Sequence, residues 1–332
     1  MSKTTVCLLS MGVFFVLFAG CAPEVKDVDE PVAVKADISL KYVPGQVATY
    51  RSASEMTQEV IFEQPALKKT KVDRVNIQLD IKFDQVIETV NADGSAIAKI
   101  TFKDIRVYRE APKGVSIDFD SNREEDKKDS AYNLIGKSYT VKLMPDGKAS
   151  SVDTKDAMAA IKGIDAAEIA KALLNEKEIS KRHGIPGIPT DGLNKVSAGD
   201  NWYKISIGHE LLLPPKSFKK TYTVSNIEGK DGKKMIHVSM EAAESAESAE
   251  DAGEVSPIAA FLGPMVDGAE TYSGDMTFDS SGGLVADYDE KLVANYATTG
   301  EAMGVAIGVA AKENPDMIKF NLIYSISLES VK

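Results

Sequence analysis

The chain has 332 residues, with 39 lysines and arginines against 50 aspartates and glutamates, and 43% of its residues are hydrophobic. This apolar content is enough for a folded core, and a net charge of −11 argues against a general nucleic-acid binder, because phosphate recognition needs a cationic surface. Only two cysteines are present, which excludes a disulfide scaffold, a four-cysteine zinc site and an iron–sulfur cluster.

Residues 1–20 have the layout of a bacterial lipoprotein signal peptide. Lys3 supplies the positive start, and the apolar stretch that follows is shorter than the roughly 20 residues that cross a bilayer. The segment ends in Phe18-Ala19-Gly20-Cys21, which resembles the lipobox, although Phe18 stands where Leu or Val is usual. We therefore expect cleavage before Cys21 and palmitate-type acylation of this cysteine, which anchors the protein in the membrane. An ordinary cleaved signal and an uncleaved anchor are the alternatives.

Lipidation also decides the location and the thiol chemistry of the mature chain. Cys7 leaves with the signal peptide and Cys21 is alkylated, so no free thiol remains. Ala22 follows the modified cysteine, where Asp would be expected in an inner-membrane lipoprotein of enteric bacteria. The sequence thus predicts a cell-envelope protein anchored in the outer membrane and facing the periplasm.

The mature chain divides into a tether and a β-rich domain. Residues 21–37 are polar and contain two prolines, which is typical of a flexible tether. Order is expected over 38–332, with two β lobes at 38–150 and 196–332 and a helical segment at 153–190 between them.

Alternation of apolar and polar residues predicts antiparallel strands with one wet face. It is strict over 75–84, over 96–102 and over 318–328. Residues 91–94 (Asn-Ala-Asp-Gly) join the first two runs as a hairpin turn, and a change of phase at 103–104 indicates a bulge.

The last strand carries the most detailed expectation. Phe320, Leu322 and the Tyr324 ring should be buried, with Lys319, Asn321 and Ser325 on the other face. We expect residues 303–309, in which glycine and alanine alternate with bulky residues, to pair with this strand through a turn at 313–316.

Helical spacing predicts one amphipathic helix over 166–182. Asp165 and Glu168 form a capping-box-like pair, and the buried face should hold Ile169, Leu173 and Leu174. A weaker helix is expected at 154–163. The fold class is therefore mainly β (α+β): a large antiparallel, curved sheet or half-open barrel, or two β lobes, with a helical connector.

One segment resembles a metal loop. Asp118, Asp120 and Asn122 match the first half of a calcium loop, but Arg123 and Asp129 stand where that loop needs Gly and Glu. These three residues are the weak calcium candidates of the chain, and no metal site is expected from them.

No catalytic or cofactor-binding residue emerges from the sequence. His183, His209 and His237 form no metal-type pair and are expected to be structural. Serine-hydrolase, P-loop and dinucleotide-binding motifs do not occur, so no cofactor is expected.

Several turn and strand markers resemble those of an uncharacterised family of exported bacterial proteins. The markers are Tyr42-Val43-Pro44-Gly45 followed by Tyr50 (YxPGxxxxY), residues 136–147 (GxxxxxxLxPxG), and Val196–Trp202 (VxxGDxW). The resemblance covers most of residues 40–290 and implies no activity.

The sequence therefore favours a lipid-anchored envelope protein of non-catalytic binding or structural type. A carrier of an apolar ligand or lipid in a β cavity is the first alternative, and a carboxylate-based hydrolase is the second. The expected partners are the membrane, through Cys21, and an apolar ligand or an envelope protein, but no nucleic acid.

Overall fold

A computed structural model describes most of the chain after the tether. It covers residues 34–161, 164–190, 192–207, 216–230, 232–247, 267–300 and 315–331. The predicted signal peptide, Cys21, nearly all of the tether and residues 303–309 lie outside these ranges. Among the residues described, no helix is both long enough and apolar enough to cross a membrane.

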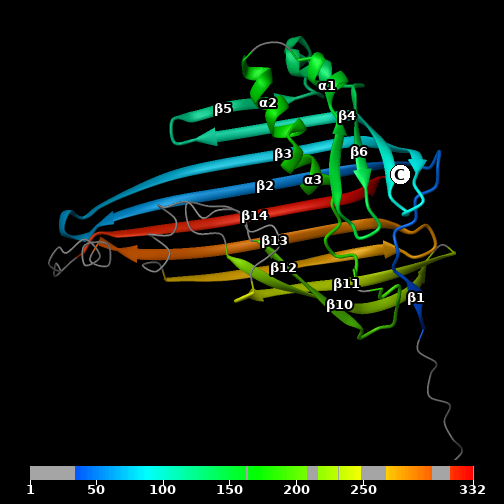
Figure 1. Cartoon of the computed structure of the whole chain (residues 1–332). Helices are drawn as coiled ribbons and strands as arrows, with labels where there is room; N and C mark the ends of the chain where they lie inside the picture. Colours follow the sequence, from blue (N-terminus) through cyan, green and yellow to red (C-terminus); the bar gives the residue numbers. More distant parts are fainter. Residues whose placement is uncertain are drawn as a thin grey trace, which may run out of the picture. The chain divides into compact units, whose positions relative to one another are not determined.

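One 12-stranded antiparallel sheet dominates the described residues (Figure 1). Its strands are β2 (Val47–Gln64), β3 (Lys69–Val90), β4 (Ala96–Ala111), β5 (Gly114–Asp120), β6 (Ser138–Leu143), β7 (Ala149–Asp153), β9 (Asn201–Ile207), β10 (Ser217–Lys230), β11 (Lys233–Glu244), β12 (Asp267–Asp279), β13 (Leu284–Thr299) and β14 (Met317–Val331). The order is β7-β6-β4-β3-β2-β14-β13-β12-β11-β10-β9, with β5 beside β4. The sheet is open, and this architecture confirms the predicted fold class.

The two expected β lobes are halves of this single sheet. Strand β14 joins them, because it pairs with β13 on one side and with β2 on the other. A small second sheet pairs β1 (Ala36–Asp37) with β8 (Lys195–Val196).

The central position of β14 overturns one prediction. A strand has two edges, and both edges of β14 are already occupied over Met317–Glu329. The expected pairing of this strand with residues 303–309 is therefore wrong. Alternation along the strand did place Lys319 and Asn321 on the face opposite the apolar residues. Of the three residues that were expected to be buried, however, only Leu322 is fully buried. Phe320 and Tyr324 are half-buried.

The β3–β4 hairpin has the predicted turn and bulge. Gly94 adopts a left-handed conformation (φ 78°), and the Asn91 N–H donates to the Ser95 carbonyl. Lys82 pairs with Asp104 and Phe83 with Phe102, which leaves Lys103 as the extra residue. The bulge changes the phase of β4, so that Phe102 and Ile105 are both buried on the same side.

The predicted single helix over 166–182 is two helices, α2 (Ile164–Leu174) and α3 (Glu176–His183). Asn175 separates them, because its backbone is extended (ψ 152°) and its side chain accepts a hydrogen bond from the Glu178 N–H. The expected burial of Ile169, Leu173 and Leu174 is confirmed. The weaker helix is α1 (Lys155–Ala159), and short 3-10 helices span Pro65–Leu67, Glu125–Lys128 and Ser130–Leu134.

Helices α2 and α3 cross one face of the sheet (Figure 1), which we call the helix face. Ile179 of α3 is fully buried, and the His183 ring packs edge-on against Phe83 of β3 with ring centroids 5.0 Å apart. The core lies between these helices and the sheet, which places α3 beside any cavity on that face.

Candidate ligand-binding cavity

The calcium candidates form a turn that contains its own cation. The Arg123 guanidinium donates to Asp118 Oδ2 at 3.1 Å and to the Asp118 carbonyl at 2.7 Å. Asp120 accepts a hydrogen bond from the Asn122 backbone N–H. Within the described ranges, no three His, Cys, Asp or Glu side chains gather in a way that could hold a metal ion. The arrangement is that of a charged surface turn.

A cavity of about 660 Å³ lies between α3 and the strands β9 to β14. Its wall is aliphatic and aromatic in large part, with Ile185, Pro186, Ile326, Leu328, Tyr222, Tyr272, Tyr288 and Tyr324 among its residues. It also contains six cationic side chains but only two carboxylates: Lys148, Lys177, Lys181, Arg182, Lys204 and Lys220, against Asp146 and Glu290. The cavity is thus apolar and positively charged within a chain of net charge −11.

One wall of the cavity holds a buried ion pair. Lys220 Nζ of β10 lies 2.8 Å from Glu290 Oε1 and 2.7 Å from Oε2 of β13, and both side chains are 5% exposed. The Tyr272 hydroxyl contacts Lys220 Nζ at 2.8 Å and donates to Glu290 Oε2 at 2.6 Å. Tyr288 also donates to the same carboxylate. Every charge in this cluster therefore has a partner inside the protein.

One glycine and two tyrosines allow this cluster to form. A Cβ at Gly274 of β12 would lie 2.3 Å from the Asp289 carbonyl and 3.2 Å from Glu290 Cγ, so the close approach requires glycine. Burial, followed by the Glu290 charge, raises the pKa of Tyr272 and of Tyr288. Both tyrosines therefore stay protonated and donate hydrogen bonds to the carboxylate.

The cavity wall formed by α3 holds a second buried cation with different partners. Arg182 is 4% exposed, and its Nη1 donates to the Tyr139 hydroxyl at 3.2 Å and to the Leu173 carbonyl at 2.9 Å. Tyr139 Oη lies 2.7 Å from His183 Nε2. Burial, and then the Arg182 charge, lowers the pKa of His183 well below 6.5, so the ring that shares a hydrogen bond with the Tyr139 hydroxyl is neutral. Hydrogen bonds thus connect Arg182, Tyr139 and His183.

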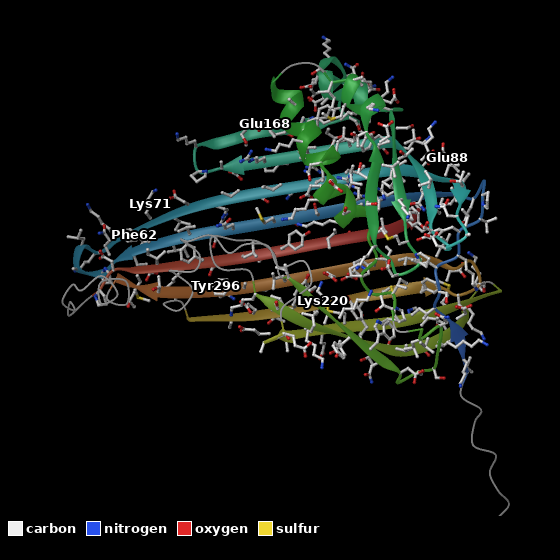
Figure 2. All side chains as sticks on the ribbon, viewed as in Figure 1. Phe62, Lys71, Glu88, Glu168, Lys220 and Tyr296 are labelled. Atoms are coloured by element: carbon white, nitrogen blue, oxygen red, sulfur yellow. The ribbon has the colours of Figure 1, made fainter. Side chains whose placement is uncertain are left out.

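A second cavity, of about 490 Å³, lies against α2 and α3 over β2, β3 and β4. Its apolar wall includes Met56, Ile77, Leu79, Val107 and Ile117, and Arg109 pairs there with Glu168 of α2 at 3.5 Å. Tyr324 of β14 lines both cavities and a small pocket that is also lined by Glu178 and Arg182. Figure 2 labels Glu168 on α2 and Lys220 on the strands at the opposite side of the α3 helix.

Sequence reasoning missed the charged residues of the cavity. The expected structural role of His183 is supported by its burial against Phe83 and Tyr139, whereas Arg182 is not among the site residues that the sequence predicts. His237 is partly exposed beside Glu228, and His209 lies outside the described residues. A signal did exist for the ion pair, because Lys220 and Glu290 interrupt otherwise apolar phases of their strands.

Comparisons with known proteins give no family. No protein-family description and no curated protein matches the chain. A lipovitellin structure is similar over 88% of this chain and 26% of its own, with 10% identity and a TM-score of 0.44, so the chain spans about a quarter of that protein. DynF from the dynemicin biosynthesis pathway of Micromonospora chersina matches over 93% of this chain and 92% of its own, with 8% identity and a TM-score of 0.16. OpdQ of Pseudomonas aeruginosa matches over 85% and 97%, with 8% identity and a TM-score of 0.17. We base no functional conclusion on similarities this weak.

Proposed function

We propose that this protein is a lipid-anchored bacterial envelope protein that binds an amphiphilic ligand in the cavity between α3 and the sheet. The observation that carries the proposal is the cavity of about 660 Å³, with its apolar wall and its excess of cations. This volume falls within the range of roughly 300–1,000 Å³ that is usual for small-molecule sites. The cavity favours the carrier alternative over a purely structural role.

A hydrolytic role receives less support from the same wall. Hydrolysis with two carboxylates needs one to protonate the leaving group and one to act as base or nucleophile. Glu290 is instead bonded to Lys220, Tyr272 and Tyr288, so it has no capacity left for a substrate. We therefore propose binding without catalysis.

Ligand binding can be tested with the methyl ester of cis-parinaric acid, an uncharged fluorescent lipid. We expect the detergent-solubilised full-length protein to bind it. Ala149 of β7 lines the cavity, so Ala149→Trp should weaken binding by roughly tenfold or more, which is about 1.4 kcal/mol. Val152→Trp is the matched control, since Val152 lies on the same strand but is 53% exposed and absent from the cavity wall. A wild-type protein that binds no ester contradicts the proposal.

The anchor needs its own experiment. We expect the wild-type protein to incorporate labelled palmitate and the Cys21→Ser variant to be released from the membrane or misprocessed. A Cys21→Ser protein that stays in the membrane fraction at its normal processed size, together with an unlabelled wild type, would refute lipidation.

A further inference from the structure

We infer that Arg182 binds the anionic group of the ligand, so that the ligand class is an amphiphile with one carboxylate or phosphate group. This inference rests on the proposed function and names the chemistry of the group that the cavity recognises. Arg182 lines both the large cavity and the small pocket beside Tyr324.

The first argument is the missing counter-ion. Arg182 is 4% exposed, yet its two acceptors, the Tyr139 hydroxyl and the Leu173 carbonyl, are both uncharged. Among the residues that the structure describes, no carboxylate forms an ion pair with the guanidinium. A buried charge without a partner is costly, and an anionic ligand group in the cavity would remove this cost.

The second argument is the remaining hydrogen-bonding capacity. A guanidinium has five N–H donors in a rigid planar fork, which suits two oxygens of a carboxylate or phosphate. Both known bonds of Arg182 start from Nη1. The donors on Nε and Nη2 make no hydrogen bond to a described residue, and they are the donors that a ligand could use.

The third argument is that the surroundings of Arg182 hold it in place. Leu173 lies in the last turn of α2 and is fully buried, and Tyr139 is fixed on β6 by its contact with His183. The guanidinium is therefore positioned before a ligand arrives, which lowers the entropic cost of binding.

Lys220 does not offer the same opportunity. Its ammonium group already contacts both oxygens of Glu290 and the Tyr272 hydroxyl. An anion that approached Lys220 would have to displace Glu290, whereas an anion at Arg182 would displace no described carboxylate. The charge balance of the cavity thus places the recognition site on α3.

The test compares cis-parinaric acid with its methyl ester on the full-length protein. We expect the wild type to bind the acid at least about tenfold more tightly, which is about 1.4 kcal/mol. Arg182→Gln should remove this preference while changing the affinity for the ester by no more than about twofold, and Arg182→Lys should retain part of it. Arg74→Gln, which removes the same charge at an exposed position outside the cavity wall, is the control and should keep the preference.

Each result separates this inference from the proposed function. Binding of neither probe by the wild type contradicts the proposed cavity function itself. Equal binding of acid and ester by the wild type, or an unchanged preference in Arg182→Gln, overturns only the role of Arg182. If Arg182→Gln does not fold, the wild-type preference and the Arg182→Lys variant still decide the question. Displacement of the ester by dodecanoate or by dodecyl phosphate, with dodecanol as the neutral reference, then distinguishes a carboxylate from a phosphate ligand.

Discussion

Two buried cations face the same cavity, and their surroundings differ. Lys220 is held by Glu290 and Tyr272, and Tyr288 donates a hydrogen bond to the same carboxylate, so that the cluster is electrically neutral and complete. Arg182 is buried to the same degree but contacts only a hydroxyl and a carbonyl. The comparison indicates that the β9–β13 side of the cavity is a finished structural wall, whereas the α3 side keeps a charge for a ligand.

The largest expected effect comes from removing β14, the strand that joins the two halves of the sheet. A chain that ends at Pro315 should lose its cooperative unfolding transition, because β14 pairs along its length with both β13 and β2. Circular dichroism during denaturant unfolding measures this. A chain that ends at Ser330 is the control and should unfold like the wild type. If the shorter chain also unfolded at the wild-type midpoint, the two halves would be independent.

Breaking the neutral cluster should cost the next largest amount. Glu290→Gln leaves Lys220 buried without a counter-charge, and we expect a loss of about 3–5 kcal/mol in the free energy of unfolding. The double variant Lys220→Met/Glu290→Leu should recover most of this loss, because it removes both charges. A cost below about 1 kcal/mol for the single variant, the range of an exposed ion pair, would show that the cluster is solvated.

The helix that supports Arg182 can be tested through its packing. Leu173→Ala should lower the free energy of unfolding by about 2–5 kcal/mol, because the Leu173 side chain is fully buried. Met158→Ala, at a side chain that is 48% exposed on α1, should stay within about 0.5 kcal/mol. Denaturant melts of both variants give the comparison, and equal values would place α2 at the surface.

The smallest effect is a pH dependence from His183. Its pKa is lowered in the folded protein by burial and then by Arg182, while the unfolded chain should titrate near the ordinary value of about 6.5. Below that pH the unfolded chain binds a proton that the folded chain does not bind. Stability is therefore fully present above about pH 6.5 and falls with decreasing pH, by at most about 1.4 kcal/mol per unit.

Unfolding of His183→Gln between pH 5 and pH 7, compared with the wild type, measures this contribution as a flatter slope. Met158→Ala is the control, because this side chain carries no titratable group, and it should keep the wild-type slope. Identical slopes for the wild type and His183→Gln would mean that folding does not shift the pKa of the ring.

The sequence predicted the local features of the fold because they depend on neighbouring residues. Alternation determined the strands, the Asn-Ala-Asp-Gly turn determined the β3–β4 hairpin, and the change of phase revealed the bulge at Lys103. The spacing of Ile169 and Leu173 identified the buried face of α2. The interruption at Asn175 was missed, although asparagine is itself a preferred N-cap residue.

Only the tertiary structure decided which strands are neighbours and which charges meet. Residues 264 positions apart in the sequence can pair as freely as adjacent ones once a sheet forms, as Leu322 and Gln58 show in β14 and β2. Lys220 of β10 and Glu290 of β13 meet although β11 and β12 lie between their strands, and Arg182 of α3 meets Tyr139 of β6. Periodicity shows which face a residue occupies, but the partner on that face depends on long-range packing. The cavity and its unpaired arginine are consequences of that packing.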